Sequence, residues 1–208
     1  MARDFRAALA RDRCWDAHTE RIYDRTGVPL DDCILQNRED LLAFCGFIER
    51  EQIRSYLEIG IWTGRLVSTL HRLFDFERVA ACDNGAVLEL GLPQYVPFGC
   101  AFFRGDSQSA ECVAWRRSLG PIDLVLIDGD HSYQGVKRDF EIQRRFPHRW
   151  LAFHDVLGLD VHTVGVRRFW DELEGEGEKI VIAEPHLEVG RATPTMGLGL
   201  WRAGDRGR

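Results

Sequence analysis

The stretch LVLIDGDHSYQGV, residues 124–136, gathers side chains that could do chemistry. An apolar run suited to a buried strand ends in Asp128, Asp130 and His131. Ionised carboxylates are costly to bury unless another group compensates their charge, so acids at such a strand end need a partner. A cation would be one such partner, and an imidazole, with an ordinary pKa of about 6.5, accepts a proton near neutral pH. The stretch therefore predicts a functional site.

A second apolar run, RWLAFHD at residues 149–155, ends in His154 and Asp155. Ligands bind to open α/β sheets at the carboxyl ends of the strands, so we expect both strand ends to open on one crevice. A cation there would also offset the repulsion among the gathered acids. The alternatives without function are local turn bonds at Asp128 and Asp130, and capping of a strand end by the second pair.

A third pattern, YLEIGIWTG at residues 56–64, places Glu58, Gly60 and Gly64 across an expected turn from a strand into a helix. Glycines let backbone and ligand approach closely, and a helix start offers unpaired N–H groups. The spacing is not the G-x-G-x-x-G of dinucleotide sites, because Ile61 and Trp62 stand where the second glycine would fall. The alternative is a tight turn without a ligand.

Seven apolar runs of strand length alternate with segments whose apolar residues recur every three or four positions. The runs are continuous, as is typical of a largely parallel sheet with helices on both faces. This pattern predicts a doubly wound α/β fold. The expected strands lie within 55–61, 78–83, 99–103, 122–128, 149–155, 179–184 and 196–201, and the expected helices within 63–75, 107–119, 135–146 and 163–174.

The chain has 208 residues, the length of one domain, and we expect a single domain over residues 1–208. Residues 1–54 are expected to form a helical cap over the crevice, with an amphipathic stretch at 38–52. Residues 55–202 are expected to form the core, and 203–208 a frayed tail.

The composition, with 45% hydrophobic and 29% charged residues, is that of an ordinary soluble globular protein. No stretch approaches the roughly 18 uncharged apolar residues of a membrane span. The net charge of −6 gives no bulk attraction to nucleic acid or anionic lipid, so a small-molecule partner is favoured. No signal-peptide pattern opens the chain and its six cysteines are widely spaced, so we expect reduced thiols and a cytoplasmic location; a homo-oligomer stays open.

The glycine pattern resembles the first motif of class I S-adenosylmethionine-dependent methyltransferases, an acid, one residue, then G-x-x-x-G. Glu58 through Gly64 matches it. The resemblance implies a Rossmann-like fold in which this turn, with Trp62, holds the methionine part of the cofactor. It also implies that Asp83 in AACDNG, about twenty residues on, accepts hydrogen bonds from the ribose. Plain Asp-Asn-Gly turn chemistry is the alternative for Asp83.

Farther along, RGDSQSA places Asp106 and Ser107 at an expected helix start, where members of that family often contact the adenine. An N-cap explains Ser107 equally well. From about Asn37 onward, the whole set of motifs is similar to small bacterial methyltransferases related to sugar and natural-product O-methyltransferases and to cephamycin-pathway enzymes. That resemblance implies a seven-stranded sheet whose last strand is antiparallel.

In related metal-dependent O-methyltransferases, including the catechol and caffeoyl-coenzyme A types, an acid after strand four and a pair after strand five bind magnesium. The resemblance carries these ligands onto Asp128, His154 and Asp155. The general base of those relatives, a lysine three positions after the first ligand, falls on His131. Because His154 replaces a carboxylate, manganese, iron or another metal that accepts imidazole is the alternative to magnesium. Asp130 is a candidate to support the ligands.

The implied activity is metal-assisted transfer of a methyl group from S-adenosylmethionine to a hydroxyl of a small molecule, such as a natural product, a sugar or a catechol. A non-catalytic module that binds the cofactor is one alternative, although it would not need Asp128, His131 and Asp155 together. A nicotinamide-dependent oxidoreductase is another, although it would favour the missing middle glycine.

Overall fold

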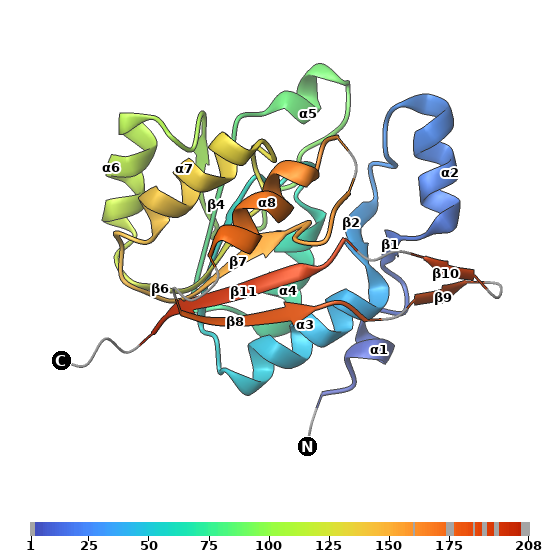
Figure 1. The fold of residues 1–208 in the computed structure, drawn as a ribbon, viewed down its shortest axis with the longest axis horizontal. Coiled ribbons are helices and arrows are strands. Elements are labelled where there is room, and N and C mark those ends of the chain that lie inside the picture. The colour runs from blue at the N-terminus through green and yellow to red at the C-terminus, as the bar shows by residue number, and fades with distance from the viewer. Residues whose placement is uncertain are drawn as a thin grey trace.

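A seven-stranded sheet forms the centre of the protein in this computed structural model, which describes residues 3–159, 161–173, 177–184, 186–188, 191–193 and 196–204 (Figure 1). The strand order is β5-β4-β3-β6-β7-β11-β8. The five strands from β5 to β7 pair in parallel, and β11 pairs antiparallel with both β7 and β8. The predicted α/β sheet is confirmed. Its strands are β3 (Ser55–Ile59), β4 (Arg78–Asp83), β5 (Ala101–Arg104), β6 (Ile122–Ile127), β7 (His148–His154), β8 (Gly177–Ile182) and β11 (Leu198–Ala203).

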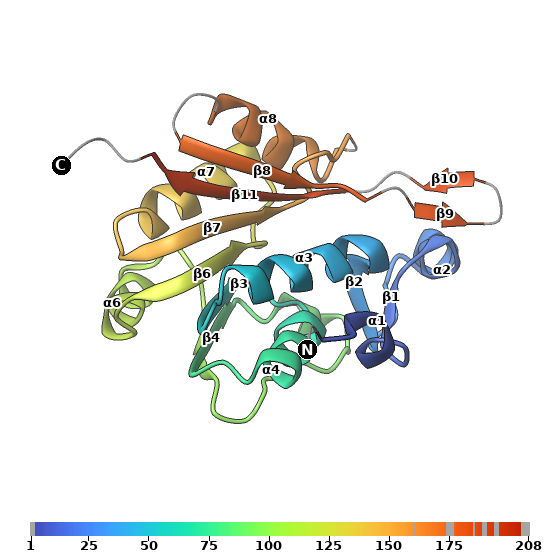
Figure 2. The ribbon, with the colours of Figure 1, turned by 90° about the horizontal axis from the view of Figure 1, so that it is seen from below.

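Helices cover both faces of this sheet. Figure 2 shows α3 (Arg38–Arg50) and α4 (Arg65–Phe74) on one side, and α7 (Tyr133–Gln143) and α8 (Val164–Glu172) on the other. Helix α6 (Ala110–Ser118) precedes β6, and the short α5 (Ala86–Glu89) follows β4. Each crossover from one parallel strand to the next therefore contains a helix, as parallel pairing requires.

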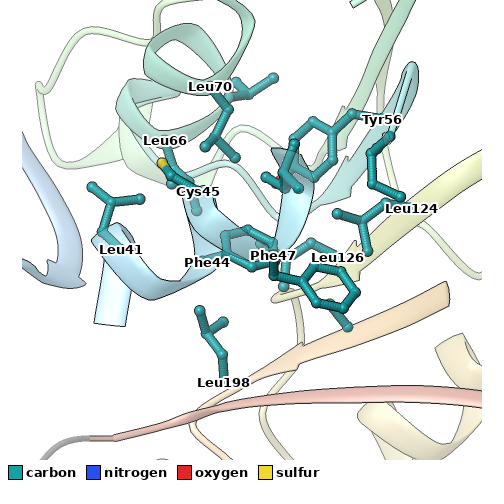
Figure 3. Packing of buried hydrophobic residues seen from close by; sticks show 14 of the residues in the cluster. Leu41, Phe44, Cys45, Phe47, Tyr56, Leu66, Leu70, Leu124, Leu126 and Leu198 are labelled. Carbon is teal, nitrogen blue, oxygen red and sulfur yellow. The ribbon is translucent and has the colours of Figure 1, made fainter. Parts of the chain in front are cut away.

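The side chains of β6 alternate between two buried clusters, as the two-residue period of a strand dictates. Leu124 and Leu126 pack in the cluster shared with α3 and α4 (Figure 3). Val125 and Ile127 pack in the cluster shared with α7 and α8. Both faces of the strand are thus buried, which explains why its sequence is continuously apolar.

The expected helical cap contains α1 (Phe5–Ala8), α2 (Ala17–Thr26) and α3. It also contains two strands, β1 (Arg13–Trp15) and β2 (Cys33–Asn37), which pair in parallel as a separate small sheet. β1 has only three residues, and β2, although as long as β3, ends in the polar residues Gln36 and Asn37 and so does not form a continuous apolar run. The sequence pattern therefore gave no signal for them.

A second small antiparallel pair, β9 (His186–Glu188) and β10 (Arg191–Thr193), lies between β8 and β11 in the chain. The expected tail begins within β11, which ends at Ala203, and 205–208 lie outside the described residues. Among the described residues, no helix combines the length and apolar character needed to cross a membrane.

Candidate active site

The polar residues at the ends of β6 and β7 form one cluster. His131 Nε2 lies 3.0 Å from Asp128 Oδ1, and His131 Nδ1 lies 3.6 Å from Asp155 Oδ2. His154 Nδ1 lies 3.4 Å from Asp128 Oδ1 and 2.9 Å from Asp155 Oδ1. The structure therefore brings together the four residues predicted as base and metal ligands.

The register between β6 and β7 determines where this cluster forms. β6 and β7 are parallel neighbours with Ile127 opposite Phe153, so the residues that follow them, Asp128 and His154, emerge side by side. The backbone of Asp155 then turns with a φ of +61°, in the left-handed region that non-glycine residues seldom adopt. Such conformations persist where the surrounding structure enforces them, and they concentrate at functional sites.

The imidazoles and carboxylates of this cluster shift one another's pKa. Burial lowers the pKa of His154, but Asp128 and Asp155 outweigh it and raise this pKa to about 10. Burial also lowers the pKa of His131, and the hydrogen bond and charge of Asp128 raise it above its ordinary value. Burial raises the pKa of Asp155, yet the two imidazoles bring it below its usual range. The imidazoles and the carboxylate of Asp155 thus stabilise one another's charged forms.

A divalent cation fits this cluster. Ligand atoms of Asp128, His131 and Asp155 all lie within 4.8 Å of one another, and within the described part of the chain this is the one such group of three. It shares two members with the metal set expected from the sequence and has His131 where that set has His154. The His131 side chain is 31% exposed and that of His154 only 10%, so a molecule in the crevice reaches His131 more easily.

Asp130 lies apart from this cluster. It is exposed, and its Oδ1 accepts a hydrogen bond from the backbone N–H of Ser132 at 2.8 Å. Its side chain also packs against Gly135, where an added Cβ would collide with the carboxylate. Asp130 thus makes the local turn interaction that was the alternative for it.

The turn at residues 60–64 requires its glycines for two reasons. Gly60, Trp62 and Gly64 all have positive φ, at +80°, +50° and +77°. A Cβ on Gly60 would collide with the backbone carbonyl of Asp128, and a Cβ on Gly64 with that of Tyr95. Close approach of neighbouring backbone therefore contributes to this pattern, in addition to any ligand.

Asp83, at the end of β4, stabilises this turn through hydrogen bonds. Its Oδ2 accepts hydrogen bonds from the backbone N–H groups of Ile61 (2.9 Å) and Trp62 (3.1 Å). Its Oδ1 accepts from the N–H of Gly85 (2.6 Å) and from Nε2 of Gln94 (2.9 Å). The carboxylate therefore lies against the expected cofactor loop, and its bond from Gly85 is the local turn interaction that was the alternative for it. A ribose contact stays a prediction.

Sequence reasoning missed Gln94 and Tyr95, which lie over the turn. Gln94 Nε2 also donates to the carbonyl of Trp62 at 2.9 Å, and the N–H of Tyr95 donates to the carbonyl of Thr63 at 2.8 Å. Their segment lacks a motif and a helical or strand period. No local signal could have located them, because the carbonyls that they bind belong to a different segment, the turn at residues 60–64.

Glu58 occupies a different place from the one expected of a ligand-contacting acid. It is 1% exposed and accepts a hydrogen bond from the Tyr56 hydroxyl at 2.6 Å. Burial raises the pKa of Glu58 to about 8, against the opposing effect of that hydrogen bond. Its carboxyl group is buried beneath the turn and paired with Tyr56, and a contact between Glu58 and the cofactor stays a prediction.

Replacing Glu58 with glutamine is expected to change how stability depends on pH. The folded-state pKa of Glu58 lies above the ordinary 4.5. The contribution of this residue to the free energy of unfolding is therefore fully present below about pH 4.5 and is lost as the pH rises through about 8. Relative to E58Q, the wild type should lose up to about 1.4 kcal/mol per pH unit across this window. Urea unfolding at pH 5, 6, 7 and 8 measures this difference, and a pH-independent difference would show that Glu58 ionises normally.

Asp106 and Ser107 lie between β5 and α6. Asp106 is exposed, and its Oδ1 accepts from the backbone N–H of Gln108 at 2.9 Å. The Ser107 hydroxyl donates to Asp139 at 2.8 Å. The N-cap of α6 is Ser109, so the capping alternative for Ser107 is wrong by two residues. An adenine contact at residues 106 and 107 stays a prediction.

Comparison with known proteins finds similarity to methyltransferases. Residues 57–156 match the family model described as a methyltransferase domain. No curated protein matches the sequence. Among solved structures, an O-methyltransferase from Bacillus cereus in complex with S-adenosylhomocysteine has 15% identity and a TM-score of 0.56, over 96% of this chain and 91% of that one.

Two further structures share the fold. The O-methyltransferase TomG from Streptomyces achromogenes, involved in tomaymycin synthesis and bound to S-adenosylmethionine, has 17% identity and a TM-score of 0.57, over 98% of this chain and 91% of that one. MycE of the mycinamycin pathway, with magnesium, S-adenosylhomocysteine and mycinamycin VI, has 16% identity and a TM-score of 0.52, over 80% of this chain and 50% of that one. Residues 57–156 are thus similar in sequence to a methyltransferase domain, and the chain shares the fold of these O-methyltransferase structures.

Proposed function

We propose that this protein transfers a methyl group from S-adenosylmethionine to a hydroxyl of a small molecule, with a divalent cation at Asp128 and Asp155. The observation that carries the proposal is the contact between the glycine turn and the acidic cluster. Gly60 packs directly on the backbone of Asp128, whose N–H donates to the carbonyl of Ile59 at 2.8 Å. A cofactor on the turn and an acceptor at the cluster would therefore be neighbours.

The reaction requires an oxygen nucleophile that is deprotonated and aligned with the sulfonium methyl group, because methyl transfer is an in-line displacement. A bound cation would lower the pKa of a hydroxyl that coordinates it. In this proposal His131 is the base, in the tautomer whose Nε2–H would donate to Asp128 Oδ1, 3.0 Å away, and so orient the ring. Its Nδ1, which carries no proton in that tautomer and lies 3.6 Å from Asp155 Oδ2, would accept the hydroxyl proton.

The test is a matched set of titrations and turnover assays on the purified full chain. Calorimetry with S-adenosylmethionine should give saturable binding, and a nicotinamide dinucleotide should give none. Methyl transfer to 1,2-dihydroxybenzene and to a panel of sugars should require added Mg²⁺ or Mn²⁺ and should stop with EDTA. Full turnover in exhaustively stripped protein would reject the cation, and absence of S-adenosylmethionine binding would reject the proposal as a whole.

A further inference from the structure

A basic pocket lies where the N-terminal segment meets α4. Its volume is about 310 Å³, at the lower end of the roughly 300–1,000 Å³ that small-molecule sites occupy. The four positive charges in its lining exceed the two negative charges, although the whole chain carries a net charge of −6. The charged residues that line it are Arg11, Arg13, Arg65, Arg72, Asp12 and Asp32.

The two carboxylates of the pocket occupy few of the donors that the guanidinium groups carry. Arg72 donates to Asp12 through Nη2, at 2.8 and 3.0 Å, and Arg13 donates to Asp32 through Nη1, at 2.9 Å. The side chain of Arg11 is exposed and has no ion-pair partner within the described part of the chain. Because each guanidinium has five N–H donors, a ligand in the pocket finds several of them unused.

The fold holds the N-terminal side of this pocket in place without a ligand. The guanidinium of Arg38 donates to the backbone carbonyls of Leu9, at 2.7 Å, and Asp12, at 2.6 Å. These two bonds fix the short segment that carries Arg11 and Arg13. The parallel pairing of β1 with β2 also positions Arg13, which is the first residue of β1.

Helix α4 forms the other side of the pocket. Arg65, Ser68 and Arg72 follow one another at intervals of three and four residues, so they lie on one face of the helix. The Arg65 guanidinium lies 3.9 Å over the ring of Tyr95, and its Nε donates to the backbone carbonyl of Asp31 at 3.1 Å. This guanidinium is therefore restrained, while its two terminal nitrogens remain for a ligand.

We propose that this pocket binds a phosphate group, either as the free ion or as the monoester of a small molecule. An anion offsets the repulsion among the gathered guanidinium groups, and a phosphate group carries a charge of about −1.5 to −2 near neutral pH. Its oxygens match the paired N–H donors of guanidinium groups. The pocket shares no lining residue with the glycine turn or the acidic cluster, so this ligand is a third molecule beside the cofactor and the acceptor.

The experiment is a calorimetric titration of the purified full chain in metal-free buffer at constant ionic strength. The probes are inorganic phosphate, glucose 6-phosphate and, as a monoanion of similar size, acetate. Arg11→Gln removes one positive charge from the pocket and breaks no contact among the described residues. Arg138→Gln is the matched control, because Arg138 is an exposed residue of α7, which covers the opposite face of the sheet from α4 (Figure 2).

The wild type and R138Q should bind a phosphate compound saturably and with equal affinity, and both should bind acetate far more weakly. R11Q should bind the same compound about tenfold more weakly, as expected for one lost hydrogen bond to a charged group. Without ligand, R11Q should keep the Tm of the wild type, since Arg11 supports no other residue. Tighter binding of glucose 6-phosphate than of inorganic phosphate would assign the site to monoesters, and the reverse order would assign it to the free ion.

Three results would overturn the proposal. One is the absence of saturable binding of both phosphate compounds at millimolar concentrations. Another is equal affinity for acetate and phosphate, because the pocket would then attract anions only in general. The third is a loss of affinity that is the same in R11Q and R138Q, or absent in both, because binding would then occur elsewhere on the surface.

Discussion

Replacing His131 with alanine is expected to lower kcat by about 10²–10⁴-fold, the usual contribution of a positioned general base. The affinity for S-adenosylmethionine should change little, because His131 contacts Asp128 and Asp155 rather than the glycine turn. Single-turnover methyl transfer separates the chemical step from cofactor binding. An unchanged single-turnover rate would remove His131 from the reaction.

The pH profile gives this experiment an independent readout. His131 acts as a base only when neutral, so the wild-type rate should rise as pH increases through its pKa, and this limb should be absent in H131A. The two acids raise that pKa in the metal-free protein, and a cation bound to them opposes the effect. Metal affinity of H131A addresses the remaining alternative, because a loss well beyond the roughly 10–100-fold expected for a residue that only supports a ligand would make His131 a ligand and not the base.

Replacing Asp83 with alanine is expected to weaken S-adenosylmethionine binding by about 10²-fold or more. Hydrogen bonds to a charged group contribute about 1.5–3 kcal/mol each, and two are expected from the ribose hydroxyls. The same change removes the acceptor of the N–H groups of Ile61 and Trp62, so the turn itself should lose order. Calorimetric titration measures the affinity, and equal values in wild type and variant would contradict a ribose contact.

Gln94→Ala is the matched control for this change. It removes one donor from Asp83 Oδ1 and leaves the carboxylate in place. Because the Gln94 amide occupies an oxygen that a ribose hydroxyl needs, Q94A should bind S-adenosylmethionine as tightly as the wild type or more tightly. A loss as large as that of D83A would show that the carboxylate needs Gln94 to hold its position. Thermal unfolding of both variants separates loss of the fold from loss of the contact.

The sequence alone determined the sheet and the place of the cluster. Continuous apolar runs such as IDLVLI can be satisfied only by burial on both faces, so they specify central strands with helices on either side. Once those strands are parallel, the residues just beyond them must share one edge. Asp128 therefore lies close to His154 and Asp155 because these residues stand at the carboxyl ends of two neighbouring parallel strands.

Tertiary structure decided what each polar atom contacts. The sequence showed the spacing of Glu58 and Gly60, but only the structure shows that Glu58 is buried against Tyr56 and that the backbone just after β6 leaves no room for a side chain at Gly60. The same holds for the parallel β1–β2 pair and for the contact of Gln94 with Asp83. The physical reason is that periodicity reports whether a side chain is buried, whereas its partner depends on segments brought close only by folding.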